Sequence, residues 1–171
     1  MVKTSLFYEV VPGLLFAGGC PWEQSTENGL FLALMSLGIR DFMTLRDDFE
    51  IDDVQASVHS SYPNISIQQF PISDFSVPDA QSLHRILHTM VEHIACGKQI
   101  YVGCAKGLGR TGLIIACFLS LHHGISGRDG LKLMNELRMQ GNFQIDSASP
   151  ETSEQVEYIM KFQNTAYAKL D

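Results

Sequence analysis

The sequence predicts an α/β fold, a single-domain sandwich in which helices flank a central, mostly parallel sheet. Strand-like and helix-like segments alternate in the first half of the chain, whereas helices dominate the second half. Apolar residues make up 45% of the 171 residues and charged residues 18%, which is enough apolar material for a packed core. A chain of this length fits one domain, covering residues 1–171.

The first elements are separated by turn-forming residues. Residues 10–17 are predicted to form a short strand that a turn at Pro12-Gly13 interrupts and that ends at Gly18. Residues 26–37 have the spacing of a helix, and Gly38 is expected to end it. The predicted apolar face of this helix comprises Leu30, Leu34 and Leu37.

Two further strands are predicted at residues 39–45 and 65–70. Acidic residues are concentrated between them, and we interpret that segment as a solvated loop with a short helix. These residues are Asp47, Asp48, Glu50, Asp52 and Asp53.

The second half begins with a helix that Asp79 caps and that runs to residue 95. A short apolar strand follows at residues 99–102, and then a strongly apolar helix at residues 111–122 that is expected to be buried on most sides. Ser126 is expected to cap a further helix to about residue 139.

The last helix is predicted to start at Pro150, after a loop over residues 140–149. Its expected apolar stripe comprises Val156, Ile159, Met160, Ala166 and Tyr167.

The charge balance restricts the partners of the chain. The formal charge is −7, which argues against broad binding to nucleic acid or to an anionic membrane. Residues 93–128 nevertheless contain no acidic residue and carry a charge of +4, so a small local site for an anion is compatible with the total. We therefore expect no nucleic-acid or membrane partner.

Cysteine usage and the N-terminus indicate a cytoplasmic protein. The four cysteines show no C-x-x-C spacing and are too few for a disulfide scaffold. No signal-peptide pattern is present at the N-terminus, and no apolar stretch approaches the roughly 18 residues of a membrane span.

Two motifs overlap between the predicted strand at 99–102 and the helix that follows. The pattern Gly107-x-Gly109-x-x-Gly112 fits a dinucleotide fingerprint, but no strand follows the helix, so that interpretation fails on context. The second motif is Cys104-x5-Arg110-Thr111. A glycine-rich loop between a strand and a helix can turn successive N–H groups inward and form a nest for an anion.

Each residue type in the second motif suits phosphate chemistry. The guanidinium of Arg110 can hold two phosphate oxygens, and the same positive surroundings favour a thiolate at Cys104. A thiolate beneath a bound phosphate can attack phosphorus in line, and the Thr111 hydroxyl can donate to that thiolate and ease its departure. The expected phosphate-binding residues are Ala105, Lys106, Gly107, Leu108, Gly109 and Arg110.

A phosphomonoester also needs a proton on its leaving oxygen, and Asp74 is the candidate acid. It follows the strand predicted at 65–70 and lies next to Phe75, between Pro71 and Pro78. On spacing alone, an ordinary loop aspartate explains Asp74 equally well.

The loop at residues 104–111 resembles the signature loop of the cysteine-dependent protein tyrosine phosphatase superfamily. Nearly the whole chain is similar to the small atypical dual-specificity phosphatases of that superfamily. The supporting motifs are Val11-Pro12-Gly13-Leu14 with Ala17-Gly18, Pro71-x-x-Asp74, and Glu151-Thr152-x-Glu154-Gln155. The resemblance implies that Cys104 is the nucleophile, Arg110 the phosphate clamp, Asp74 the general acid and Thr111 the partner of the thiolate.

The resemblance also places Glu151 and Gln155 near the catalytic loop, where Gln155 would orient the attacking water. The alternative is that both residues belong to a helix N-terminus, where an acidic residue is favourable in any case.

Three features depart from the family pattern. Gly103 replaces the histidine that usually precedes the cysteine, so turnover is expected to be weaker than typical. Lys106 adds a positive charge to the variable part of the loop and would suit highly anionic substrates, unless it points into solvent. The segment 139–150 is longer than the usual short turn there, and we expect it to alter one wall of the cleft.

The expected function is hydrolysis of phosphotyrosine, and also of phosphoserine and phosphothreonine, in proteins or peptides. Two alternatives stay open: the same chemistry on a phosphoinositide or an RNA 5′-phosphate, and a phosphate-binding module without catalysis. No cofactor and no metal are expected, because Arg110 and the loop amides can stabilise the charge. A monomer is the default.

Overall fold

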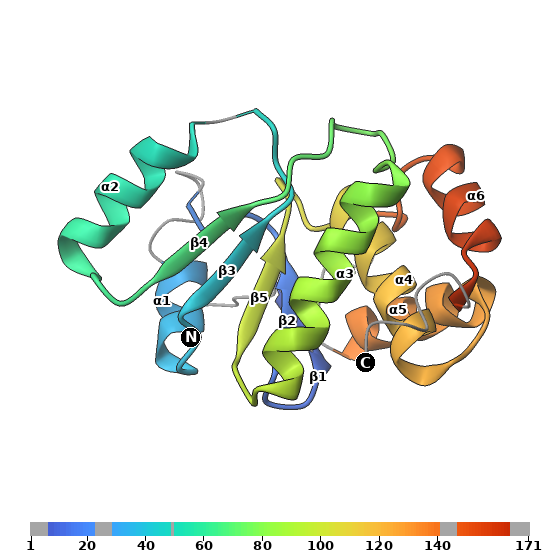
Figure 1. Cartoon of the computed structure of the whole chain (residues 1–171), viewed down its shortest axis with the longest axis horizontal. Coiled ribbons are helices and arrows are strands. Elements are labelled where there is room, and N and C mark those ends of the chain that lie inside the picture. Colours follow the sequence, from blue (N-terminus) through green and yellow to red (C-terminus); the bar gives the residue numbers. More distant parts are fainter. Residues whose placement is uncertain (1–6, 23–28, 49, 141–146, 165–171) are drawn as a thin grey trace.

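A computed structural model describes residues 7–22, 29–48, 50–140 and 147–164. Within them, five strands form one sheet with the order β1-β2-β5-β3-β4, and helices lie on both faces (Figure 1). Strands β2, β5, β3 and β4 run parallel to one another, and β1 pairs antiparallel with β2. The predicted α/β sandwich with a mostly parallel sheet is therefore confirmed.

The N-terminal hairpin replaces the single strand predicted at residues 10–17. β1 (Phe7–Val11) and β2 (Leu15–Gly18) are two strands, because the turn at Pro12-Gly13 reverses the chain completely. Gly13 adopts a φ of +70°, which glycine adopts without steric penalty.

The parallel strands bring the beginnings of three connecting loops to one edge of the sheet. β5 (Ile100–Gly103) is central and all four of its residues are buried, and it pairs with β2 on one side and β3 (Asp41–Thr44) on the other. β4 (Ser66–Gln69) pairs with β3 and forms the edge. Because carboxyl ends of parallel strands meet at the same edge, the chain segments that follow β3, β4 and β5 lie together.

Helices α1 (Leu30–Ser36) and α2 (Ile51–Ser61) pack in one apolar cluster, which includes the rings of Phe16, Phe42 and Tyr101. A larger cluster lies on the opposite face, beneath α3 and the later helices. These are α3 (Ala80–Ala95), α4 (Gly109–His123), α5 (Gly127–Gln140) and α6 (Ser153–Lys161).

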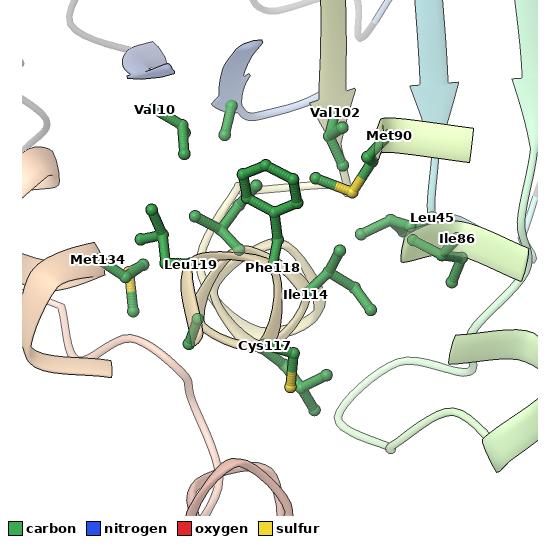
Figure 2. Packing of buried hydrophobic residues seen from close by; sticks show 14 of the residues in the cluster. Val10, Leu45, Ile86, Met90, Val102, Ile114, Cys117, Phe118, Leu119 and Met134 are labelled. Carbon is green, nitrogen blue, oxygen red and sulfur yellow. The ribbon is translucent and has the colours of Figure 1, made fainter. Parts of the chain in front are cut away.

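Helix α4 is the centre of the larger cluster. Figure 2 shows Ile114, Cys117, Phe118 and Leu119 leaving this helix in several directions. Each of these side chains is fully buried, as the continuous apolar run predicts. The start of α4, which carries the end of the Cys104–Arg110 motif, is thus fixed in the core of the protein.

Several predicted details of the helices are confirmed and others are wrong. Asp79 caps α3 by accepting a hydrogen bond from Ser82 N at 2.7 Å, as predicted. Leu37 is 46% exposed because α1 ends at Ser36, and Met160 is 40% exposed because it lies on the outer side of α6. Ala166 and Tyr167 lie outside the described residues.

The start of the last helix also differs from the prediction. α6 begins at Ser153, and Thr152 caps it by accepting from Gln155 N, so Pro150 precedes the helix. Through the described parts of the chain, no helix is long and apolar enough to cross a membrane.

Candidate active site

Residues 104–110 comprise the tight loop between β5 and α4 and the first two residues of α4, and we call them the phosphate loop. Gly107 has a φ of +75° in this loop. A Cβ there would overlap the backbone of Gly18 and lie 2.7 Å from its carbonyl oxygen, so the loop can approach β2 this closely only with glycine at that position.

Two carbonyl groups of the phosphate loop are bound from outside it. The Ala105 carbonyl accepts from Cys20 N at 3.0 Å, and the Leu108 carbonyl accepts from Ser149 Oγ at 2.7 Å. In a trans peptide the following N–H points the opposite way, so the N–H groups of Lys106 and Gly109 are directed away from these partners. We expect these N–H groups, together with the other free N–H groups at the start of α4, to form the nest for an anion that the sequence predicts.

The nucleophile candidate and the cation of the phosphate loop are both buried. The side chains of Cys104 and Arg110 are both 3% exposed. Arg110 Nη1 donates to the Ile72 carbonyl at 3.0 Å and lies 3.5 Å from Asp47 Oδ1. Arg110 Nε is buried and has no hydrogen-bond partner among the described residues. The Nε and Nη2 edge of the guanidinium is therefore suited to hold two oxygens of a phosphate.

Asp74 lies within reach of the same guanidinium, although it is far from Arg110 in sequence. Its Oδ1 is 3.1 Å from Arg110 Nη2 and accepts from Phe75 N at 3.1 Å. Neither contact uses Oδ2, which is the oxygen available for a proton. The loop that carries Asp74, residues 70–79, joins β4 to α3, and we call it the acid loop (Figure 1).

Thr111 is fully buried at the start of α4. Its hydroxyl donates to the Gly18 carbonyl at 3.4 Å in this structure, not to the Cys104 sulfur. A hydroxyl has one proton, so donation to a thiolate requires its rotation away from Gly18.

Gln155 and Glu151 are near the phosphate loop, as the resemblance implied. A Cβ placed on Gly109 would lie 3.2 Å from both amide atoms of Gln155 and 2.6 Å from Glu151 Oε2. Gln155 is also part of the helix N-terminus, because its Oε1 accepts from Glu151 N at 3.1 Å and Thr152 N at 3.3 Å. The two interpretations of Gln155 are thus compatible in space.

The structure gives a physical reason for Gly103 at the position before the cysteine. A Cβ at residue 103 would lie 2.8 Å from the Gly19 carbonyl and 3.0 Å from the ring of Tyr101. The Tyr101 hydroxyl donates to that same Gly19 carbonyl at 2.6 Å. Burial raises the pKa of Tyr101 well above its ordinary value, so this donor keeps its proton.

Lys106 is exposed, whereas residues 107–110 of the loop are buried.

Cys117, by contrast with Cys104, lies in the apolar core, and burial raises the pKa of its thiol. Cys117 is therefore an inert core residue.

Sequence reasoning missed three residues that contribute to the site: Asp47, Ser149 and Thr152. Asp47 had been assigned to a solvated loop, but it lies against Arg110. The pattern Thr152-x-x-Gln155 is a capping box that is recognisable in sequence. Nothing in the sequence indicates that Ser149 reaches the Leu108 carbonyl.

The surroundings of the phosphate loop are less basic than the run from residue 93 to 128 suggests. Asp47, Asp74 and Glu151 all approach the loop from other segments. Asp48 is also close to this side, and its hydrogen bond with Arg46 lowers the pKa of its carboxyl, so it stays ionised. The local site for an anion that this basic run allows is thus a cationic centre with an acidic border.

Comparison with known proteins agrees with this geometry. The family model for the DSP-PTPase phosphatase domain of Swiss Army Knife proteins, PTP-SAK, matches residues 4–162. Protein 067L of Invertebrate iridescent virus 3, which is named as a tyrosine phosphatase, is 29% identical over 96% of this chain and 67% of its own length. A relative from Methanocaldococcus jannaschii, an uncharacterized protein, is 26% identical over 54% of this chain and 56% of its own length.

Solved structures share the fold. The crystal structure of TpbA from P. aeruginosa in complex with pTyr has a TM-score of 0.68 at 16% identity and covers 99% of both chains. PTPMT1 in complex with PI(5)P has a TM-score of 0.69 at 16% identity and covers 95% of this chain and 99% of its own. With the family model matching almost the entire chain, the protein belongs to the PTP-SAK family of DSP-PTPase phosphatase domains, within the cysteine-dependent protein tyrosine phosphatase superfamily.

Proposed function

We propose that the protein hydrolyses phosphotyrosine, and to a lesser extent phosphoserine and phosphothreonine, in proteins or peptides. The observation that carries the proposal is the convergence of Asp74 on the cation of the phosphate loop, with 3.1 Å between Asp74 Oδ1 and Arg110 Nη2. A buried cysteine, a buried arginine and a carboxyl on a separate loop are the groups that this hydrolysis needs.

In the first step, the phosphate would sit in the nest with two oxygens on Arg110. The Cys104 thiolate attacks phosphorus, so a sulfur–phosphorus bond forms while the bond to the ester oxygen breaks. The leaving oxygen takes the proton from Asp74.

In the second step, water attacks the cysteinyl-phosphate. Asp74, now a carboxylate, takes the proton of the water, the sulfur–phosphorus bond breaks, and inorganic phosphate leaves with regeneration of the thiolate. Thr111 is proposed to donate to the departing thiolate, after its hydroxyl turns from Gly18. Gln155 is proposed to orient the water from its place beside Gly109.

The acidic border supports a phosphopeptide over a polyphosphate. Asp47 and Glu151 would repel the additional charges of an inositol phosphate or a triphosphate RNA. The exposed Lys106 favours the alternative, a phosphoinositide substrate, and PTPMT1 in complex with PI(5)P shares the fold.

A substrate panel tests the proposal. Phosphate release from phosphotyrosine, phosphoserine and phosphothreonine peptides, phosphoinositides and triphosphate RNA is measured with malachite green. We expect the highest kcat/KM for phosphotyrosine peptides. A higher kcat/KM for a phosphoinositide or for RNA would show that this substrate, and not a phosphopeptide, is the preferred one. The absence of a product burst with any aryl phosphate would support the non-catalytic binding module.

A further inference from the structure

The first turn of α6 contacts the acid loop through two side chains. Thr152 Oγ1 donates to the Phe75 carbonyl at 3.4 Å, and Gln155 Nε2 donates to the Ser76 carbonyl at 3.1 Å. These carbonyls belong to the two residues that directly follow Asp74. We call Thr152 and Gln155 the capping-box pair, because they also close the capping box of α6.

Backbone hydrogen bonds attach the start of the acid loop to the sheet, and the Asp79 cap attaches its end to α3. Neither contact involves the centre of the loop. Phe70 N and Ile72 N donate to carbonyls of β3 and the residue after it, and Asp79 caps α3. Within the described part of the chain, the polar contacts that reach residues 73–77 from other segments are the ion pair of Asp74 with Arg110 and the hydrogen bonds from the capping-box pair. The pair is therefore in a position to determine where this part of the loop lies.

The centre of the loop also has an unfavourable backbone conformation. Phe75 has a φ of +59°, and residues with a bulky side chain rarely adopt this left-handed region. Its side chain is 54% exposed, so packing does not hold the residue there. Such a conformation persists where surrounding contacts impose it, and hydrogen bonds to the carbonyls of Phe75 and Ser76 are suitable contacts.

Gln155 is fully buried, and both polar atoms of its amide make hydrogen bonds. Its Oε1 accepts from the N–H groups of Glu151 and Thr152, and its Nε2 donates to Ser76. Gly109 leaves room for this amide, because a Cβ there would lie 3.2 Å from both of its polar atoms. The same side chain thus contacts α6, the acid loop and the phosphate loop.

We propose that Thr152 and Gln155 are positioning residues that hold Phe75 and Ser76 in place and thereby set the Asp74 carboxyl over the phosphate loop. The inference rests on the proposed function of Asp74 as the general acid. This positioning role differs from a role of Gln155 in orienting water. Positioning of Asp74 affects the first chemical step, in which the ester bond breaks, whereas orientation of water affects the second.

The variant Gln155→Glu separates the two roles. A glutamate keeps the acceptor for Glu151 N and Thr152 N, and glutamate is common in capping boxes, but it cannot donate to the Ser76 carbonyl. The measurement is kcat/KM for aryl phosphates whose leaving phenols differ in acidity. Because the added carboxylate lies beside the phosphate loop, it lowers kcat/KM for both substrates, so the readout is the ratio between them. We expect kcat/KM to fall about ten- to 10²-fold more with phosphotyrosine, which needs the acid, than with a dinitrophenyl phosphate, which does not.

A double-mutant cycle identifies the partner of Gln155. If the residue acts through Asp74, the additional loss that Gln155→Glu causes with phosphotyrosine shrinks to no more than about twofold in an Asp74→Asn background. Ser153→Glu is the matched control, since it adds the same charge to the same helical turn at an exposed position. We expect this control to keep the wild-type dependence on the leaving group.

A second pair of variants keeps the proposal testable if Gln155→Glu does not fold. Thr152→Ser retains the hydroxyl that reaches Phe75, whereas Thr152→Val loses it, and the valine variant is expected to show the stronger leaving-group dependence. An equal loss for all leaving groups, a loss in kcat alone, or full additivity with Asp74→Asn would overturn the inference. If the loss of kcat/KM in Asp74→Asn were itself the same for all leaving groups, Asp74 would not be the general acid, and the proposed function of Asp74 would be contradicted.

Discussion

The phosphate loop and the acid loop meet at the same site but are held in different ways. Cys104 and Arg110 are each 3% exposed, and the carbonyls of Ala105 and Leu108 are bound by neighbouring segments. The Asp74 side chain, by contrast, is 55% exposed, and Phe75 beside it is 54% exposed. One loop is fixed by the core, and the other is fixed by side chains that reach it from Arg110 and α6.

This difference indicates how the two parts of the chemistry depend on the fold. An anion nest uses backbone N–H groups, so its geometry follows from the path of the chain between β5 and α4. The position of the acid depends on a few side-chain contacts from distant segments. Changes to the phosphate loop should therefore affect every substrate, and changes to the acid loop should affect substrates with poor leaving groups most.

The largest effect is expected for Cys104→Ser. A hydroxyl is a far weaker nucleophile at neutral pH, so turnover of a phosphotyrosine peptide should fall by a factor on the order of 10⁴ or more. Because the nest does not depend on the sulfur, calorimetry should still detect binding of inorganic phosphate. Cys96→Ser, at an exposed cysteine, is the control and should retain activity. Substantial turnover in Cys104→Ser would contradict the assignment of the nucleophile.

Asp74→Asn tests the acid loop. We expect a decrease of about 10²–10⁴ with phosphotyrosine, because an amide cannot supply the proton, and a much smaller decrease with a dinitrophenyl phosphate. Asp79→Asn is the matched control in the same loop, since asparagine is an equally good N-cap for α3. An unchanged rate of Asp74→Asn with a phosphotyrosine peptide would remove Asp74 from the mechanism.

Gly107→Ala tests whether the backbone path alone determines the nest. A Cβ at this position would overlap the backbone of Gly18, so the loop must move, and a displacement of about 1 Å lowers kcat/KM by about 10²-fold. Gly97→Ala carries the same left-handed strain, with a φ of +67°, but its Cβ would meet no atom within 4 Å. Gly97→Ala should lose about 1 kcal/mol of stability, Gly107→Ala should lose more because of the overlap, and only Gly107→Ala should lose activity for all substrates alike.

The smallest effect is expected for Lys106→Ala. Its side chain is exposed, so its contribution to a bound monophosphate is screened, and kcat/KM for a phosphotyrosine peptide should change by less than about threefold. Lys98→Ala, at another exposed lysine, is the control. A loss restricted to phosphoinositides would instead support the alternative substrate class.

Local patterns predicted much of the fold because they depend on neighbours in sequence. The limits of α3 follow from Asp79 at its start and Gly97 after its end, and the burial of α4 follows from its continuous apolar run. The start of α6 was predicted incorrectly because Pro150 is compatible with a first helical turn, whereas the capping box of Thr152 and Gln155 determines the actual start.

The sequence by itself determined the phosphate loop and the α/β order of elements, because strand, glycine-rich loop and helix are contiguous in the chain. It left Asp74 undecided, since an aspartate in a loop has no distinguishing neighbour along the chain. Only the tertiary structure brought Asp74 and Asp47 to Arg110, and the capping-box pair to Phe75 and Ser76. The physical reason is that parallel strands gather distant segments at one edge of the sheet, and the contacts between those segments depend on packing that local patterns do not encode.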